Sequence, residues 1–258
     1  MPFISRLKYL HIIPWLLITA LPGAAPRAAP GDDPSALWKI DHGKCVPDMR
    51  KNHKPEPCKI VDLSVGYVVL KDRTGLTQYL LLPTARISGI ESPAVLAPGV
   101  PNYWDWAWRA RTLTEDRAGK ALPREALSLA VNSPFGRSQD QLHIHIDCVQ
   151  KDVRDALAAN SSAIGGSWAA FPVTMVGQTW RALRVDGDNL GTANPFDLLA
   201  KGDPAAAADM GKHTLVVVGM TWSNNVAGFA VLDGKVDPAG GNRGSGEDLQ
   251  DHACALAH

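Results

Sequence analysis

Polar and apolar residues alternate along residues 141–148, which read Gln-Leu-His-Ile-His-Ile-Asp-Cys. A period of two places successive side chains on opposite faces of a strand, so the pattern predicts a half-buried β-strand. Four polar side chains would share one face: Gln141, His143, His145 and Asp147. The apolar residues between them would pack into a core on the other face. Two imidazoles side by side on a rigid strand can bind a metal, or act as a nucleophile and its partner.

Other segments of the chain also have strand patterns. Apolar, β-rich runs at 66–71 and 78–82 flank a turn at 72–75, and together they predict a hairpin whose second strand ends at Pro83. Further apolar runs predict strands at 127–131, 180–185, 214–220 and 228–232. Since helix signals lie between several of these strands, we expect an antiparallel α+β fold.

The helix signals have recognisable ends. Helices are predicted at 102–119, 152–159, 195–201 and 247–257. Asn102 would be the N-cap of the first and Gly119 its end, while Asp152 would cap the second. Within the first helix Trp104 and Trp108 lie on one side, where we expect them to pack onto the sheet.

Composition narrows the class of protein. The chain has 258 residues, of which 45% are hydrophobic and 20% charged, as in ordinary globular proteins. Its formal net charge is zero, so it lacks the basic excess that nucleic-acid binding usually requires. We therefore expect no nucleic-acid partner.

The first 29 residues have the pattern of an export signal. Arg6 and Lys8 precede an apolar run at 10–21, which Pro14 interrupts, and small residues follow it. The run is shorter than the roughly 20 apolar residues that a membrane-spanning helix needs. A cleaved signal peptide at 1–29 is therefore favoured over a retained N-terminal membrane anchor. In either case residues 30–258 would form a single domain outside the cytoplasm.

Four cysteines, an even number in an exported chain, predict two disulfides. Three pairings are possible. Cys45 and Cys58 flank a polar, proline-bearing loop, which favours their local pairing and leaves Cys148 with Cys254. That second bond would tie the C-terminal segment to the histidine strand, and the other two pairings stay open at this point.

The loop before the histidine strand carries groups suited to phosphate. Arg137 offers a forked cation for phosphate oxygens, and Gly136 would let the backbone approach a ligand closely. The neutral donors around them are Asn132, Ser138, Gln139 and Gln141. Such donors beside an imidazole nucleophile predict phosphoryl or nucleotidyl transfer through a labile phosphoramidate.

Two other interpretations of the histidine pair remain open. His-x-His on a strand is also a zinc-binding arrangement, which would need a third ligand. His252, His213 or Asp147 would have to supply that ligand through folding. Alternatively, the two histidines have a purely structural role and are hydrogen-bonded by neighbours on the sheet.

Ordered matches along most of the chain carry a family resemblance. They lie at 66–72, 78–81, 83–87, 89–93, 107–111, 128–133, 136–139 and 141–148, together with the four cysteines. With them the chain resembles the bacterial CDP-diacylglycerol pyrophosphatases of the histidine-triad superfamily. The superfamily motif is His-φ-His-φ-His-φ-φ, where φ is apolar. Gln141 stands at the first histidine position, His143 at the middle, nucleophilic position and His145 at the last.

The resemblance implies a fold and an activity. The fold would be a HIT-like antiparallel sheet with packed helices and a C-terminal strand-rich extension. The activity would be hydrolysis of CDP-diacylglycerol to CMP and phosphatidate, in which His143 attacks the cytidine-bearing phosphorus and water releases CMP from a cytidylyl-histidine. The residues that would bind and polarise phosphates are Asn132, Arg137, Ser138, Gln139, Gln141 and His145. Neither a metal nor a cofactor would be required.

The lipid substrate implies a membrane surface as partner. The protein would then work in the periplasm or at the periplasmic face of the bacterial inner membrane, and exposed members of Trp104, Trp106 and Trp108 would contact the lipid. A broader exported nucleotide phosphohydrolase is the alternative enzyme, and a metal- or lipid-binding module is the non-enzymatic alternative.

Overall fold

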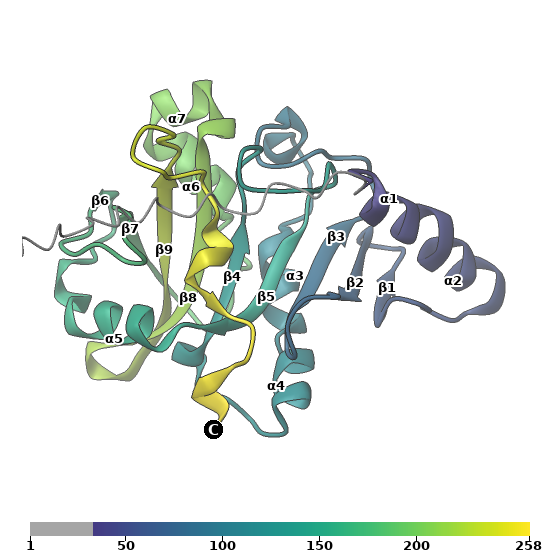
Figure 1. Ribbon diagram of the computed structural model, residues 1–258, viewed down its shortest axis with the longest axis horizontal. Coiled ribbons are helices and arrows are strands. Elements are labelled where there is room, and N and C mark those ends of the chain that lie inside the picture. Colours follow the sequence, from purple (N-terminus) through teal and green to yellow (C-terminus); the bar gives the residue numbers. More distant parts are fainter. Residues whose placement is uncertain (1–32) are drawn as a thin grey trace, which may run out of the picture. The chain divides into compact units, whose positions relative to one another are not determined.

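Ten strands of residues 33–258, the part of the chain that the computed structural model describes, form one antiparallel sheet (Figure 1). The path of the sheet is β1-β2-β3-β5-β4-β8-β9-β7-β6, and β10 pairs with β5. The strands are β1 (Ile60–Asp62), β2 (Tyr67–Lys71), β3 (Tyr79–Pro83), β4 (Leu127–Val131), β5 (Ile144–Val149), β6 (Ala169–Ala170), β7 (Arg181–Asp186), β8 (His213–Trp222), β9 (Val226–Lys235) and β10 (Gln250–Asp251). The predicted antiparallel α+β class is confirmed, whereas the predicted signal or anchor lies outside the described residues.

Seven α-helices of the described residues accompany the sheet. They are α1 (Ala36–Ile40), α2 (Val46–Asn52), α3 (Tyr103–Ala110), α4 (Thr112–Ala118), α5 (Lys151–Ala159), α6 (Pro195–Gly202) and α7 (Pro204–Ala208). A π-helical turn, Asp41–Cys45, joins α1 to α2. None of the helices within residues 33–258 combines the length and apolarity needed to cross a membrane.

The histidine strand β5 lies in the middle of the sheet. It pairs with β3 along one edge and with β4 along the other, and β10 continues the β3 edge beyond Tyr79, where β3 begins. All six residues of β5 are buried, so the expectation of a half-buried strand is wrong. The reason is tertiary, because elements far away in the sequence cover both faces of β5.

One face of the sheet carries the largest apolar cluster. Ile144 and Ile146 of β5 pack there with α3 and α6. Trp104 and Trp108 of α3 are fully buried in this cluster, and Trp108 meets Phe229 edge-on at a centroid distance of 4.8 Å. The two indoles therefore serve the core, as expected, and are not available to a lipid surface.

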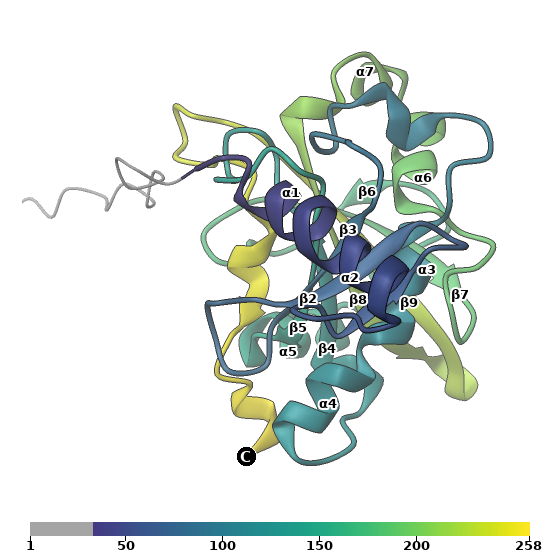
Figure 2. The same cartoon turned by 90° about the vertical axis from the view of Figure 1, so that its right-hand side faces the viewer.

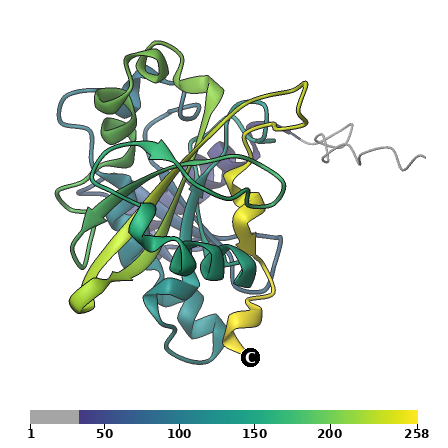
Figure 3. The ribbon, with the colours of Figure 1, turned by 90° about the vertical axis from the view of Figure 1, so that its left-hand side faces the viewer.

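The other face carries two smaller apolar clusters with a polar region between them. The α1–α2 segment packs on β1, β2 and β3 (Figure 2). In this cluster Cys45 comes from the helical segment, and Leu80 and Leu82 come from β3. Helix α5 packs through Val153 and Leu157 on the β4, β8 and β9 part of the sheet. The C-terminal segment (residues 246–257) runs on the same side of the sheet as α5 (Figure 3). It covers the polar side chains of His145 and Asp147 on β5.

Two predicted helix boundaries are corrected. The helix expected at 102–119 is split at Arg111, where the backbone N–H donates to the carbonyl oxygen of Trp108 and tightens the turn. Asn102 occupies the N-cap position, but its side-chain oxygen accepts no capping hydrogen bond, and its amide N–H donates to the carbonyl of Leu190. Gly119 ends α4 in the left-handed region as predicted, at φ 75°. Helix α5 begins one residue before Asp152, which makes no capping hydrogen bond.

The helix predicted at 247–257 is also wrong. The segment is a 3-10 turn (Gly246–Leu249), then β10, then a second 3-10 turn (Ala255–Ala257). Strand β10 pairs with Val149 and Cys148 of β5, and Cys254 has a left-handed φ of 53°. These tertiary bonds outweigh the local helix signal.

The structure contains both favoured disulfides. Cys45 and Cys58 are joined with a Cα–Cα distance of 5.7 Å, and Cys148 and Cys254 with one of 5.2 Å. The second disulfide connects the histidine strand to the C-terminal segment, as expected. Strands β2 and β3 form the expected hairpin, with Tyr67 opposite Pro83.

Candidate active site

His143 and His145 lie on the face of β5 that the C-terminal segment covers. Their rings meet edge-on with a centroid distance of 4.8 Å and an interplanar angle of 66°. His143 immediately precedes β5 and is 7% exposed, while His145 is 4% exposed. The two imidazoles therefore form a pair that is nearly withdrawn from solvent.

The protonation state of His143 follows from its hydrogen bond to the main chain of Gln141. Its Nδ1 lies 2.6 Å from the carbonyl oxygen of Gln141, which can only accept a hydrogen bond. Nδ1 therefore carries the proton, and Nε2 keeps its lone pair. Burial, together with a smaller electrostatic contribution from His145, lowers the pKa of His143 to about 3, although the hydrogen bond to Gln141 opposes this shift. The ring is neutral near pH 7, as a nucleophile must be.

His145 is held from its Nδ1 side. The amide Nε2 of Gln78 lies 2.9 Å from Nδ1 of His145, and Glu247 Oε1 lies 3.5 Å from the same atom. Nε2 of His145 is buried and has no hydrogen-bond partner among residues 33–258. The arrangement leaves one ring nitrogen of His145 for a ligand.

Glu247 is the centre of the polar network around His145. Its Oε1 accepts from Gln78 at 3.0 Å, and its Oε2 accepts from Asn132 Nδ2 at 3.1 Å. The side-chain oxygen of Asn132 accepts from the backbone N–H of Glu247 at 3.1 Å, so the two residues clamp each other. Burial opposes ionisation, but electrostatic interactions with His145 and His252 and the two amide hydrogen bonds outweigh it and lower the pKa of Glu247 to about 2. Glu247 is therefore a carboxylate.

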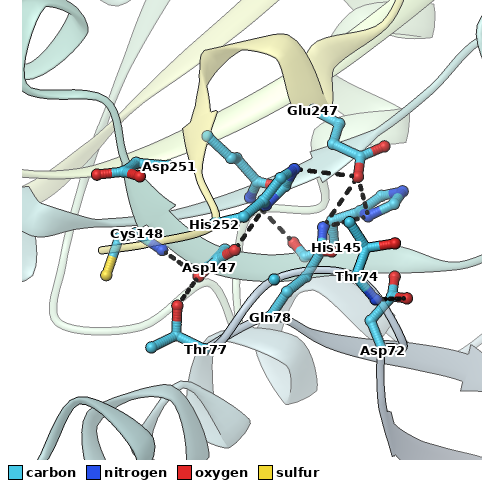
Figure 4. Close-up of polar contacts among 12 residues, drawn as sticks. Asp72, Thr74, Thr77, Gln78, His145, Asp147, Cys148, Glu247, Asp251 and His252 are labelled. Carbon is cyan, nitrogen blue, oxygen red and sulfur yellow. Dashed lines mark hydrogen bonds and ion pairs between the residues drawn. The ribbon is translucent and has the colours of Figure 1, made fainter. Parts of the chain in front are cut away.

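Asp147 and His252 extend this network (Figure 4). Nδ1 of His252 donates to Asp147 Oδ2 at 2.8 Å, and its Nε2 lies 3.4 Å from Glu247 Oε1. The other carboxylate oxygen of Asp147 accepts from Thr77 Oγ1 at 2.6 Å and from the backbone N–H of Cys148 at 2.9 Å. The hydrogen bond to Asp147 is the main cause that raises the pKa of His252. A chain of polar contacts thus connects Asp147, through His252 and Glu247, to His145.

The predicted phosphate ligand Arg137 is bound to protein acceptors in this structure. Its guanidinium forms two hydrogen bonds with Glu91, at 2.7 and 2.8 Å, and its Nε donates to the carbonyl of Gln139 at 3.0 Å. The Gln139 side chain accepts from the backbone N–H of Leu37 and donates to the carbonyl of Asp33. Both residues brace the loop before β5, and binding of phosphate would require them to exchange these bonds.

Three further predicted residues have different surroundings. The Gln141 side chain is fully buried and donates to the carbonyl oxygens of Pro83 and Ala85, at 2.8 and 2.9 Å. Ser138 is exposed at the surface of the loop. A Cβ added to Gly136 would lie 2.8 Å from the carbonyl oxygen of Gly244, so this glycine allows two loops of the protein to approach each other.

The zinc interpretation lacks a ligand set in the described part of the chain. Two of the expected third ligands, His252 and Asp147, are hydrogen-bonded to each other. The other, His213, is bonded to Asp233 at 2.7 Å and lies on β8. Within residues 33–258, no group of three or more histidine, cysteine, aspartate or glutamate side chains is placed to hold a metal ion.

Gln78 and Glu247 were not predicted from the sequence, and His252 was considered as a possible zinc ligand but not as part of this network. Gln78 could have been found, because it precedes β3 and shares the alternation that puts Leu80 on the face of His145. Glu247 and His252 carry no comparable signal. They lie about a hundred residues after His145, in a segment whose local pattern predicted a helix.

A neutral imidazole with a free lone pair, set in a buried network of ionised and polar groups, is typical of an enzyme active site. Comparison with known proteins identifies the enzyme class, a hydrolase, and the family. A family model described as CDP-diacylglycerol pyrophosphatase matches residues 32–258. The CDP-diacylglycerol pyrophosphatase of Yersinia pestis is 41% identical over 221 residues, which cover 86% of this chain and 84% of that relative. The chain therefore belongs to the CDP-diacylglycerol pyrophosphatase family.

These comparisons confirm the predicted family, the hydrolase class and hydrolysis of CDP-diacylglycerol as the activity. The two disulfides indicate a protein of an oxidising compartment, and hence one that is exported from the cytoplasm.

Proposed function

We propose that the protein hydrolyses CDP-diacylglycerol to CMP and phosphatidate with His143 as the nucleophile. The observation that carries this proposal is the hydrogen bond from His143 Nδ1 to the Gln141 carbonyl, which directs the lone pair to Nε2. Nε2 would form a bond to the cytidine-bearing phosphorus, and the bond from that phosphorus to the bridging oxygen would break. Phosphatidate would leave with the electron pair. Water would then attack the phosphorus, free His143 as CMP departs, and release one proton.

The Gln141 main chain supports this step electrostatically. When Nε2 bonds to phosphorus, the imidazole ring gains a positive charge, and its Nδ1–H then donates to the carbonyl more strongly. The Gln141 side chain has a different task, because its amide is occupied by Pro83 and Ala85. At the first position of the proposed HIT-like motif, glutamine would thus brace the turn while its backbone orients the nucleophile.

His145 is the proposed donor to the substrate phosphate. Its buried Nε2 has no partner among the described residues, so an N–H there would be satisfied by a non-bridging oxygen. Ser138 stays a proposed phosphate donor, since its side chain is exposed. We propose that Asn132, Arg137 and Gln139, whose polar groups are bound to protein partners, shape the site rather than contact the phosphate directly.

The proposed setting is the periplasm, at the face of the inner membrane. The disulfides support an exported protein, and a diacylglycerol substrate remains in or near a bilayer. Phe135, in the loop before β5, is 54% exposed and would be suitably apolar for the lipid side of the site.

Chemical trapping tests the nucleophile directly. Enzyme mixed rapidly with CDP-diacylglycerol that is labelled in the cytidine-bearing phosphate, then quenched with base, should yield a labelled peptide that contains His143. The linkage should be acid-labile, as a phosphoramidate is. Label on another residue would refute His143 as the nucleophile. Label retained on the protein only when the lipid phosphate is labelled would mean that the nucleophile attacks the phosphorus that bears the lipid. CDP esters without acyl chains, tested in parallel, would reveal a broader nucleotide phosphohydrolase.

The pH dependence of kcat/KM is a second test. Because burial is the main cause that lowers the pKa of His143 to about 3, this ring gains a second proton only well below neutral pH. We therefore expect no loss of activity that follows an apparent pKa of about 6.5, the ordinary histidine value. A profile measured from about pH 4.5 to 8 checks this. A tenfold fall for each pH unit below about 6.5 would mean that the nucleophile is solvated and not buried as described.

A further inference from the structure

We propose that Glu247 is a positioning residue that, through Gln78, fixes the tautomer of His145 so that Nε2 carries the proton. The inference deepens the proposed function, because it rests on His145 acting as donor to the phosphate. It assigns a role to two residues that lie outside the histidine motif.

The donor pattern of Gln78 follows from its two neighbours. Its Nε2 lies 3.0 Å from Glu247 Oε1 and 2.9 Å from His145 Nδ1. A carboxylate only accepts hydrogen bonds, so the NH2 end of the Gln78 amide must face Glu247. The reversed amide would place its oxygen against the carboxylate, two acceptors at hydrogen-bonding distance, which is unfavourable.

The orientation of Gln78 then determines the tautomer of His145. One hydrogen of the NH2 group is directed to Glu247, and the second is directed to Nδ1 of His145. Nδ1 must therefore accept, so a proton on Nδ1 is excluded and the ring proton must sit on Nε2. Nε2 is the atom that is buried without a partner among residues 33–258. The network thus leaves an N–H donor, and not a lone pair, facing the phosphate.

The remaining contacts of Glu247 keep it charged and in place. Asn132 clamps its other carboxylate oxygen and its backbone N–H. His252 approaches Oε1 at 3.4 Å and is itself held by Asp147. The pKa of Glu247 is lowered to about 2 despite burial, in agreement with a permanent carboxylate.

Loss of the Glu247 carboxylate is expected to allow the other tautomer of His145, with its proton on Nδ1. In Glu247→Gln the new amide can accept on one side only, so it cannot serve both Gln78 and Asn132 as the carboxylate does. In Gln78→Met the donor to Nδ1 is gone altogether. Either change would let His145 hold its proton on Nδ1 and present a lone pair to the phosphate oxygens, which repels them. We expect kcat to fall about 100-fold, the usual effect of losing one preorganised donor, with little change in KM.

Nitrogen NMR of the full chain labelled with 15N-histidine distinguishes the tautomers without substrate. The signals of His145 are identified by their loss in His145→Gln. In the wild type we expect Nε2 to be protonated and Nδ1 to be unprotonated. Both Glu247→Gln and Gln78→Met should shift the ring toward Nδ1–H. The matched control is Asp248→Asn, next to Glu247, whose carboxylate bonds to Ser245 and should leave spectrum and rate unchanged.

Two outcomes would overturn the inference. The first is a wild-type His145 with its proton on Nδ1 or on both nitrogens near pH 7. The second is an unchanged tautomer and rate in both variants, with the fold preserved. Failure of the proposed function can be distinguished from failure of this inference. Full activity in His143→Gln would refute the proposed nucleophile, whereas the NMR signals of His145 do not depend on that result.

Discussion

Replacement of His143 by glutamine is expected to lower kcat/KM at least about 1,000-fold while the protein stays folded, because the variant lacks the atom that would bond to phosphorus. Glutamine is similar in volume to histidine and can still donate to the Gln141 carbonyl, which accepts at 2.6 Å from the native ring. The packing around β5 should therefore survive. The measurement is CMP release from CDP-diacylglycerol, with circular dichroism and denaturant unfolding to establish that the fold is retained.

The matched control for this prediction is His258→Gln, the same change at an exposed residue of the C-terminus. It should leave the rate within about twofold of wild type, since surface substitutions have small effects. Retention of more than a tenth of the activity in His143→Gln would rule out covalent catalysis by His143. A loss of activity accompanied by unfolding would be resolved with His143→Asn, whose smaller amide side chain is easier to accommodate in the buried site.

Removal of the Cys148–Cys254 disulfide is expected to cost both stability and activity. The bond closes a sequence separation of 106 residues, and a loop of that size corresponds to roughly 5 kcal/mol of unfolding free energy in the chain-entropy model. It also connects β5 to the segment that bears Glu247 and His252. Without it, we expect the hydrogen bonds from this segment to Gln78 and Asn132 to be broken more often, so that kcat falls with stability.

The Cys45–Cys58 disulfide provides the matched control. Its separation is 13 residues, for which the same model gives roughly 3 kcal/mol, and it lies in the α1–α2 cluster away from Glu247. Paired serine variants at each disulfide, compared by denaturant unfolding and by assay, should show a larger loss for Cys148–Cys254 on both measures. Equal losses of stability with unchanged activity in both variants would argue that the second disulfide does not support the site.

Much of the fold could be predicted from local pattern. The hairpin of β2 and β3 and the strand β4 follow from alternation and turn residues, and their residues lie where expected. The helix at 102–119 was predicted in kind but not in continuity, because Arg111 tightens the turn on the Trp108 carbonyl. The prediction of a helix at 247–257 was wrong because β10 pairs with β5, and no local pattern indicates that contact.

The part of the site that depends on local pattern could also be predicted. His143 and His145 are two residues apart on a strand, so a local period of two places both on one face. The tasks of Asn132, Arg137 and Gln139 were harder to predict, because a donor suited to phosphate is equally suited to a protein carbonyl or carboxylate. Arg137 bonds to Glu91, which lies 46 residues before it in the chain. Which acceptor such a residue meets depends on the fold.

The sequence by itself determined the family, the hydrolase class, the antiparallel strands and the histidine pair, since all of these depend on residue identity and on spacing within a few positions. The tertiary structure decided the protonation of His143 and the polar neighbours of His145. It placed the Gln141 carbonyl on His143 Nδ1, and it brought Glu247 and His252 from the far end of the chain to His145. Protonation depends on burial and on the nearest donors and acceptors, and in a folded chain these neighbours come from residues that are distant in sequence.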